Sequence, residues 1–303
     1  MLDWLYQKTL LNQVTFNGIG LHTGKDVEMT VYPASVNSGI SFVINGVKTP
    51  ANISHLHNTQ YCTSLKHHGQ EVKTIEHFMS AVIALGLDNL EIRINSPEVP
   101  LLDGSSADFY WGLSSAGVCE QKPNKKVFAA ITKKVEVQVG ASVASIEPFE
   151  SPFVSVALEY NEPVVLKGGL TMDYDLFKGD YAVEISRART YGFEKHQEFY
   201  NQNNLARGAT VDNCLVMNDN HPLSPGGLRY NNEIVRHKIL DVFGDLALLG
   251  APFLGKYKCY QPGHTVNLAL VKKIIELDAV ENVTLKGMDS HQKEYIEVGM
   301  KAC

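Results

Sequence analysis

The sequence has little that would suit it to nucleic acid or to a membrane. The 303-residue chain carries a formal net charge of −6 and no run of five or more like charges, whereas nucleic-acid binders usually show a positive balance or patch. Its longest apolar stretches, residues 78–87 and 246–254, have about half of the ~20 residues that a membrane-spanning helix needs. The start has an early aspartate and no apolar core, so we expect no secretory signal. We therefore predict no nucleic-acid partner and no transmembrane segment.

Cysteine is scarce, and its pattern suggests no pairing. The five cysteines are odd in number and widely scattered, and none belongs to a C-x-x-C pair. Neither a disulfide framework nor a thiolate zinc site is indicated, so we expect a reducing, cytoplasmic location. The glycine-rich segment that begins at Gly18 also lacks the G-x-G-x-x-G spacing of a dinucleotide fingerprint.

The first half of the chain has the patterning of a mixed fold. Alternating apolar residues between 9 and 50, broken by Gly, Asn and Pro, predict strands and hairpins. Helical spacing predicts a helix with its N-cap at Thr74 and its end at Gly86. A second helix is expected near residues 108–115.

The second half repeats this succession of strands and helices. The polar, turn-prone segment 120–126 suggests a domain boundary, with strands expected at 127–143 and 153–158 beyond it. The strongest helical pattern covers residues 232–249. We therefore predict two α+β domains, residues 1–121 and 126–303.

Three ionisable residues occur on one stripe of that strongest helix. His237, Asp241 and Asp245 are spaced i, i+4 and i+8, and most of their neighbours are apolar. A buried charge without a partner is costly, so an imidazole and a carboxylate one turn apart could share one divalent ion. The spacing alone favours the simpler alternative, a His–Asp pair on a helix surface.

Two other segments offer groups for catalysis. Glu76 and His77 are adjacent, so on a helix their side chains diverge by about 100°, which suits a histidine that binds a metal and a carboxylate that acts on water. His264 follows Gly263 and precedes an apolar stretch. Each segment alone is better explained by helix-end stabilisation or by a turn. Together the three segments supply the nitrogen and oxygen ligands of a catalytic zinc site, with further groups for acid–base chemistry.

Six short motifs occur in order along the chain: Gly18-Ile-Gly-Leu-His-Thr-Gly, Thr74-Ile-Glu-His, Pro100-Leu-Leu-Asp-Gly-Ser, Ser186-Arg-Ala-Arg-Thr-Tyr-Gly-Phe, Val235-Arg-His-Lys-Ile-Leu-Asp-Val-Phe-Gly-Asp and Gly263-His-Thr-Val-Asn. In this order the chain resembles the UDP-3-O-acyl-N-acetylglucosamine deacetylases of Gram-negative bacteria. The resemblance runs from about residue 8 to at least 270.

The resemblance implies a fold and a reaction. The fold would be two two-layer α/β sandwich domains with helices packed between the sheets, a small insertion in each domain, and the active site at the junction. The reaction would be zinc-dependent hydrolysis of the acetamide of UDP-3-O-acyl-N-acetylglucosamine to UDP-3-O-acyl-glucosamine and acetate, in lipid A biosynthesis. The partner would be this acylated UDP-sugar, the product would pass to membrane-associated enzymes, and we favour a monomer.

The resemblance also implies roles for single residues. The zinc ligands match His77, His237 and Asp241 (iron, as Fe²⁺, also suits such a set). The general base on the zinc-bound water matches Glu76, the hydroxyl that stabilises the oxyanion matches Thr190, and the acid that protonates the leaving amine matches His264, oriented and charged by Asp245. Substrate-binding positions match Lys238, Tyr191, Tyr160, Gly263, Gly208 and Cys62.

The family's apolar passage for the acyl chain matches an insertion at about 185–217. Its candidate lining is Tyr191, Phe193, Phe199, Gly208, Cys214 and Val216. The alternative, that the aromatic residues among them are ordinary core residues, has nearly equal odds. Tyr160 takes the place of an aromatic residue that stacks on uracil.

The chain departs from the family's pattern at three positions. Gln261 and Pro262 stand where a lysine and a serine often precede the Gly-His pair, which removes a positive charge suited to a diphosphate. Arg207 stands where the family usually has an apolar or small residue. A zinc amidohydrolase acting on a different acylated sugar therefore stays open. So does a non-catalytic UDP-sugar- or lipid-binding relative, although the inferred ligands, base and acid are all present.

Overall fold

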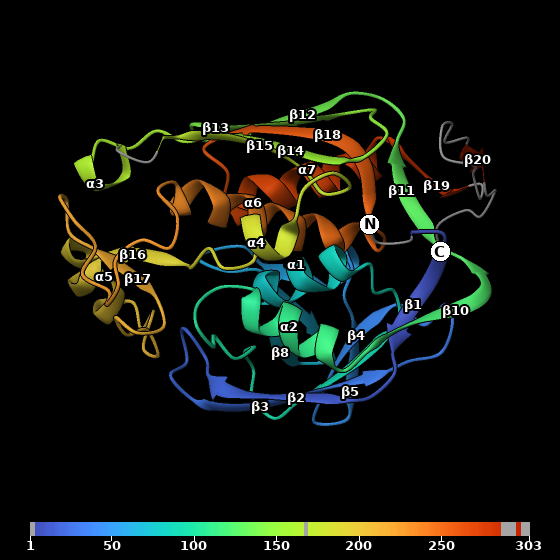
Figure 1. Cartoon of the computed structure of the whole chain (residues 1–303), viewed down its shortest axis with the longest axis horizontal. Helices are drawn as coiled ribbons and strands as arrows, with labels where there is room; N and C mark the ends of the chain where they lie inside the picture. The colour runs from blue at the N-terminus through green and yellow to red at the C-terminus, as the bar shows by residue number, and fades with distance from the viewer. Residues whose placement is uncertain (1–3, 167–168, 286–294, 298–303) are drawn as a thin grey trace.

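A computed structural model describes residues 4–166, 169–285 and 295–297, and it shows two main sheets that face each other across a layer of helices (Figure 1). The first half builds a five-stranded sheet in the order β2 (Val14–Ile19), β3 (Asp26–Pro33), β9 (Leu90–Ile94), β4 (Ile40–Ile44) and β5 (Val47–Pro50). The second half builds an eight-stranded sheet with the path β12 (Val135–Val139), β13 (Ser142–Glu147), β18 (Phe253–Tyr260), β11 (Val127–Ile131), β19 (Val280–Leu285) and β20 (Tyr295–Glu297), and with β14 (Pro152–Ala157) and β15 (Thr171–Asp175) paired beside β18. The predicted α+β class is confirmed.

Four longer helices fill the space between the sheets: α1 (Glu76–Leu85), α2 (Ala107–Ser115), α6 (Glu233–Leu246) and α7 (His264–Glu276) (Figure 1). The shorter helices are α3 (Pro163–Leu166), α4 (Tyr181–Glu184) and α5 (Gln197–Gln202), with 3₁₀ turns η1 (Ile53–His55), η2 (Glu194–His196) and η3 (Ala247–Leu249). Helix α1 packs against α2 and α6, and α7 packs against α6 and the eight-stranded sheet. Within the described ranges, no helix combines the length and the apolar character needed to cross a bilayer.

The sequence patterns explain this layering. In β3 the alternate residues Val27, Met29 and Val31 are buried, as expected for a strand with one face on the core. In α1 all ten residues are buried, because the helix is covered on all sides. Its run of small and apolar side chains fits that position, and it places the polar pair Glu76 and His77 deep inside the protein.

A glycine lets α1 and α6 approach closely enough to share one site. A Cβ atom added at Gly244 would lie 2.1 Å from the carbonyl oxygen of Glu76 and 2.8 Å from its Cα. Any side chain there would push the helices apart. Gly244 therefore sets the contact between the start of α1 and the middle of α6.

The two ends of α1 match the sequence expectation differently. Gly86 takes the left-handed conformation at φ 66° and its N–H bonds the carbonyls of Val82 and Ile83, which confirms it as the C-terminal cap. The expected N-cap at Thr74 is wrong, because the helix begins at Glu76 and the Thr74 hydroxyl donates to the buried Glu98 carboxylate at 2.8 Å. The helices expected near 108–115 and over 232–249 are confirmed by α2 and by α6 with η3.

The polar segment expected to be a turn is a strand. β10 (Val118–Lys125) pairs antiparallel with β1 (Tyr6–Leu10) in a ribbon of its own, where most of its residues are at least partly exposed and polar side chains can point to water. Just after it, the buried ammonium of Lys126 pairs with Asp88 and donates to the carbonyl of Gly86. A domain boundary near this segment stays a prediction.

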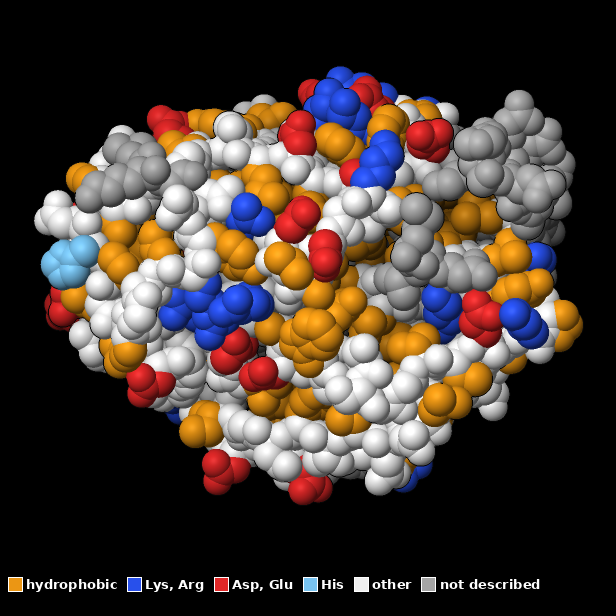
Figure 2. All heavy atoms as spheres, viewed as in Figure 1, with side chains coloured by type: hydrophobic (Ala, Val, Ile, Leu, Met, Phe, Trp, Pro, Cys, Tyr) orange, Lys and Arg blue, Asp and Glu red, His pale blue; other side chains and the backbone are white. Residues whose placement is uncertain are grey.

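Each half also carries a small sheet that is separate from the main one. In the first half it consists of β6 (Leu56–Asn58), β7 (Ser64–His67) and β8 (Gln70–Val72), and in the second half β16 (Tyr191–Phe193) pairs in parallel with β17 (Leu215–Met217) beside α5. On the face shown in Figure 2, basic, acidic and apolar side chains are interspersed, in keeping with the modest net charge of −6.

Candidate active site

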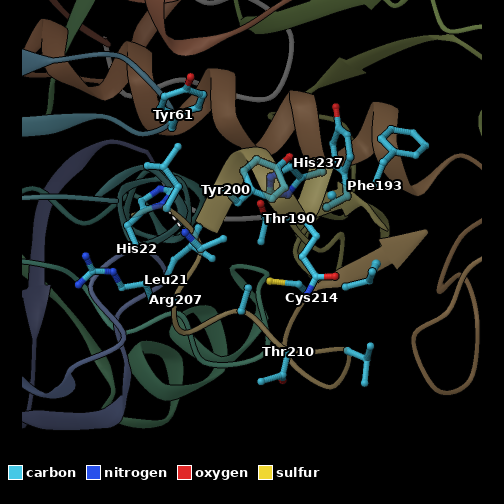
Figure 3. A pocket seen from close by; sticks show the side chains of 18 of the residues that line it. Leu21, His22, Tyr61, Thr190, Phe193, Tyr200, Arg207, Thr210, Cys214 and His237 are labelled. Carbon is cyan, nitrogen blue, oxygen red and sulfur yellow. Dashed lines mark hydrogen bonds between the residues drawn. The ribbon is translucent and has the colours of Figure 1, made fainter. Parts of the chain in front are cut away.

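A cavity of about 700 Å³ lies where α1, α6 and the small β16–β17 sheet meet. The first half of the chain contributes Leu21, His22, Tyr61, Glu76 and His77 to its wall; the second half contributes, among others, Thr190, His237, Lys238, Asp241 and His264. In Figure 3, His22 and Arg207 lie on one side of the cavity, and Phe193 and Cys214 lie on the other. The sequence-predicted catalytic and metal-binding residues are thus brought together around one space, apart from Asp245, which lies behind His264.

Three of them form a compact group. His77, His237 and Asp241 each offer one ligand atom, and these three atoms lie within 4.8 Å of one another. The Oδ1 atom of Asp241 is 3.3 Å from Nε2 of His237 and 3.8 Å from Nε2 of His77. All three side chains are buried. This group could hold a metal ion, because it combines two imidazoles and one carboxylate as catalytic zinc sites do.

The hydrogen bonds around the group fit a cation. Nδ1 of His237 lies 3.1 Å from the carbonyl oxygen of Ala188 and donates to it, so in the neutral ring Nε2 presents a lone pair to the centre. Oδ1 of Asp241 is buried and has no hydrogen-bond partner within the described part of the chain. A buried carboxylate oxygen without a partner is costly, and a metal ion at this point would satisfy it.

The protonation states also suit metal binding. Burial lowers the pKa of His77 to about 4 and that of His237 to about 3, so both rings are neutral at pH 7. Against the effect of burial, the neighbouring His237 and Lys238 side chains hold the pKa of Asp241 below its ordinary value. Lys238 Nζ donates to the second oxygen of Asp241 at 2.8 Å, which leaves Oδ1 directed to the imidazoles.

An acid–base pair lies beside this group. Nε2 of His264 is 3.6 Å from Oε1 of Glu76, and Nδ1 of His264 is 2.9 Å from Oδ2 of Asp245. Burial raises the pKa of Glu76 to about 8. Burial opposes the charge on His264, but the carboxylates of Asp245 and Glu76 outweigh it and raise the pKa of His264 to about 10. The arrangement thus pairs a carboxyl group, which in its ionised form can accept a proton, with an imidazolium that can donate one.

Two buried polar residues that the sequence reasoning missed also hold Asp245. The Thr63 hydroxyl donates to Oδ1 at 2.6 Å, and the Asn267 amide donates to Oδ2 at 2.8 Å. The Tyr257 hydroxyl donates to the Asn267 side-chain oxygen at 2.6 Å. Asn267 could have been found, since it lies three residues after His264 on the same helix face. Nothing local in the sequence distinguishes Thr63.

Two backbone hydrogen bonds and a neighbouring ion pair fix the position of Thr190. Its N–H donates to the Gly104 carbonyl at 2.6 Å, and its own carbonyl accepts from Leu215 in the small sheet. The neighbouring Arg189 is buried and pairs with the buried Glu233 at the start of α6, at 2.8 Å from Nε to Oε1. This ion pair, also missed from the sequence, ties the segment that carries Thr190 to the helix that carries His237.

The predicted substrate-binding residues divide into two sets. Lys238 and Tyr191 line the cavity with Phe193, Cys214 and Val216, and the Lys238 ammonium lies 5.3 Å from the centre of the Tyr191 ring. The described wall of the cavity does not include Tyr160, Gly263, Gly208, Cys62 or Phe199. Tyr160 lies behind Tyr191, with 2.7 Å between the two hydroxyl oxygens.

Two of the departures from the family pattern lie in different places: Arg207 lines the cavity, and Gln261 lies in the turn between β18 and α7. Arg207 is part of the cavity wall beside His22 (Figure 3). Gln261 takes a left-handed conformation at φ 56°, and its amide donates to the Glu159 carbonyl at 2.9 Å.

Comparison with known proteins identifies the family. Residues 7–276 match the family model described as UDP-3-O-acyl N-acetylglycosamine deacetylase. The chain belongs to this deacetylase family. It is 40% identical over 296 residues to the UDP-3-O-acyl-N-acetylglucosamine deacetylase of Saccharophagus degradans, covering 96% of this chain and 97% of that relative. The deacetylase of Xanthomonas oryzae pv. oryzae is 40% identical over 273 residues, covering 89% of this chain and 90% of the relative.

The family resemblance drawn from the six motifs is thereby confirmed. The metal group, the cavity and the acid–base pair described above are those of a member of this deacetylase family. The roles of the single residues stay predictions.

Proposed function

We propose that this protein is a zinc-dependent deacetylase that hydrolyses the acetamide of UDP-3-O-acyl-N-acetylglucosamine to UDP-3-O-acyl-glucosamine and acetate, in lipid A biosynthesis. The observation that carries the proposal is the meeting of His77 with His237 and Asp241 around a buried carboxylate oxygen that has no hydrogen-bond partner among the described residues. The membership of the chain in the deacetylase family supports the reaction and the substrate class.

The three residues of this group would hold the zinc ion. When bound, zinc polarises the amide carbonyl and lowers the pKa of water towards ~7, which supplies a nucleophile at neutral pH. Fe²⁺ is a second candidate ion, because a nitrogen and oxygen set suits it too.

Glu76 acts as the general base. Its carboxylate is buried next to the ligand His77 and accepts a hydrogen bond from the Thr63 N–H at 3.1 Å, which fixes one oxygen and leaves the other facing the cavity. It takes a proton from the attacking water as the new C–O bond forms at the acetyl carbon. The Thr190 hydroxyl donates to the carbonyl oxygen as negative charge develops there.

His264 completes the reaction as the general acid. An amine leaves poorly without a proton, and the charged His264 has its Nε2–H on the cavity side while its Nδ1–H bonds Asp245. Transfer of the Nε2 proton to the sugar nitrogen lets the C–N bond break, which yields the amine and acetate. The neutral His264 regains its proton after the products leave.

The lining of the cavity supports positions for the sugar and for the acyl chain. Lys238 and Tyr191 line the cavity next to the metal group and suit the sugar. Tyr160, Gly263, Gly208 and Cys62 lie outside the described cavity wall and stay expectations from the family resemblance alone. The apolar wall formed by Leu21, Tyr61, Phe193, Cys214 and Val216 suits an acyl chain. Because Arg207 and Gln261 depart from the family pattern, the preferred acyl length and the contacts to the diphosphate are quantities to measure for this protein.

The test is acetate release by the purified zinc-loaded protein from UDP-3-O-acyl-N-acetylglucosamine substrates of graded acyl length. We expect release that a chelator abolishes and added zinc restores. Absence of release at every length, in protein with one zinc per chain, would contradict the proposal. Tight binding of these substrates without turnover would favour a non-catalytic relative, and turnover of another acylated sugar alone would favour a different amidohydrolase.

The remaining sequence expectations are part of the same proposal. These are two domains of residues 1–121 and 126–303, with the acyl-passage insertion at about 185–217. They also include a cytoplasmic monomer that passes its product to membrane-associated enzymes.

A further inference from the structure

A buried residue touches both sides of the acid–base machinery. Thr63 is fully buried and lies in the loop between β6 and β7. Its backbone N–H donates to Oε2 of Glu76 at 3.1 Å, and its hydroxyl donates to Oδ1 of Asp245 at 2.6 Å. Thr63 therefore bonds both Glu76, the proposed general base, and Asp245, which contacts the proposed general acid His264.

Three hydrogen-bond donors surround the Asp245 carboxylate. Besides the Thr63 hydroxyl, it accepts from the Asn267 amide at 2.8 Å and from Nδ1 of His264 at 2.9 Å. The Tyr257 hydroxyl bonds the amide oxygen of Asn267, so the NH₂ group must face Asp245. Three donors on one buried carboxylate fix its position and orientation against His264.

His264 depends on that negative charge. It is the first residue of α7, and the positive end of a helix dipole disfavours a cation at that place. Burial disfavours the cation as well. The carboxyl groups that face the two ring nitrogens, Asp245 and Glu76, must therefore favour the proton on the ring.

We propose that Thr63, assisted by Asn267, is a positioning residue that holds the Asp245 carboxylate against Nδ1 of His264, and so supports His264 in its role as general acid. The inference rests on the proposed deacetylase function. It assigns Thr63 no contact with the substrate. Its effect reaches the reaction through Asp245 alone, since the backbone bond to Glu76 does not require the side chain.

Other groups also face His264, and they bear on how its proton responds to pH. The charged and titratable side chains around it are Asp245 and Asp241 from α6, Glu76 and His77 from α1, and His22 from the turn after β2. Of these, Asp245 alone is bonded by the Thr63 hydroxyl. A change confined to that hydroxyl thus leaves the other charges unchanged.

The experiment compares Thr63→Val with Thr63→Ser in the zinc-loaded protein. Valine keeps the shape of threonine and the backbone bond to Glu76 but removes the hydroxyl, whereas serine keeps the hydroxyl. We measure the pH profile of kcat/KM for acetate release, the zinc content and the Tm. For Thr63→Val we expect a lower rate and a basic limb shifted to lower pH by about one unit, because the charged form of His264 is less favoured. Thr63→Ser should keep the basic limb of the unmodified protein.

The outcomes separate a positioning role from a structural one. A Thr63→Val protein that has a lower Tm but an unmoved basic limb would overturn the inference. If that variant does not fold, Asn267→Leu removes the donor on the other oxygen of Asp245 and must shift the basic limb in the same direction. Failure of the unmodified zinc-loaded protein to release acetate would instead contradict the proposed function, so the two failures are distinguishable.

Discussion

The contact between α1 and α6 makes a sharp prediction for Gly244→Ala. The new Cβ would lie 2.1 Å from the Glu76 carbonyl oxygen, whereas ordinary contacts of a Cβ begin at 3.4 Å. The shortfall is 3.4 − 2.1 = 1.3 Å, and it lies against backbone that cannot rotate away. The helices must therefore separate by about 1 Å, at a cost of about 1–3 kcal/mol for overpacking, part of which the better helix propensity of alanine offsets.

The separation would also reach the metal group. His77 follows Glu76 on α1, and Asp241 lies one turn before Gly244 on α6, so the ligands move apart with the helices. We expect zinc affinity to fall by about 10-fold or more, as for a change that misorients metal ligands. Zinc competition against a chromophoric chelator measures the affinity, and thermal unfolding measures the stability.

A matched control separates the two effects. Gly250 follows η3 with φ 88° and has nothing within 4 Å of an added Cβ, so Gly250→Ala strains the backbone without touching α1. It should lower the Tm and leave zinc affinity unchanged. Unchanged affinity and Tm in Gly244→Ala would refute the claim that this glycine sets the distance between the two halves of the site.

Three further predictions test other parts of the site. Glu76→Gln should keep zinc and lose hydrolysis by about 10²-fold or more, whereas His77→Ala should lose zinc itself. Elemental analysis and acetate release check both variants. Near-normal turnover in Glu76→Gln, or a full zinc content in His77→Ala, would contradict the assigned roles. Glu233→Gln leaves the buried Arg189 without its counter-charge and should lower the free energy of unfolding by about 3–5 kcal/mol in urea titration, while the exposed pair removed by Glu276→Gln should cost little. In zinc-free protein the pKa of His264 is raised to about 10, so the native state binds more protons than the unfolded state between about pH 6.5 and 10. The stability that this group contributes is therefore present below about pH 6.5 and is lost as the pH rises through 10. In chemical denaturation, His264→Gln should make this fall in stability with pH less steep.

Much of the fold could be predicted because periodicity reports burial. The alternation in β3 and the apolar pattern of α1 and α6 are direct consequences of one buried face or of complete burial. The start of α1 could not be predicted, because the Thr74 hydroxyl bonds Glu98, a residue brought near only by the fold. The segment predicted to be a turn is the strand β10. Its strand character could not be predicted, because its partner β1 lies more than a hundred residues earlier in the chain.

The candidate site divides in the same way. The spacing of His237, Asp241 and Asp245 on one helix draws attention to them, but their roles could be predicted only from the family motifs in which they occur. Thr63 and the Arg189–Glu233 pair could not, since what makes them relevant is a contact across the fold and not a local pattern. Cys62 and Gly208 were proposed as substrate contacts, yet they lie outside the described cavity wall.

The ligand group takes one residue from α1 and two from α6, and this division has a consequence for stability. An ion held by both helices binds well only when they are docked, so its binding free energy adds to their association, by about 2.7 kcal/mol when the free ion is at 100 times its Kd. Zinc supply would then set how firmly the two halves of the molecule stay together, as well as whether the reaction proceeds.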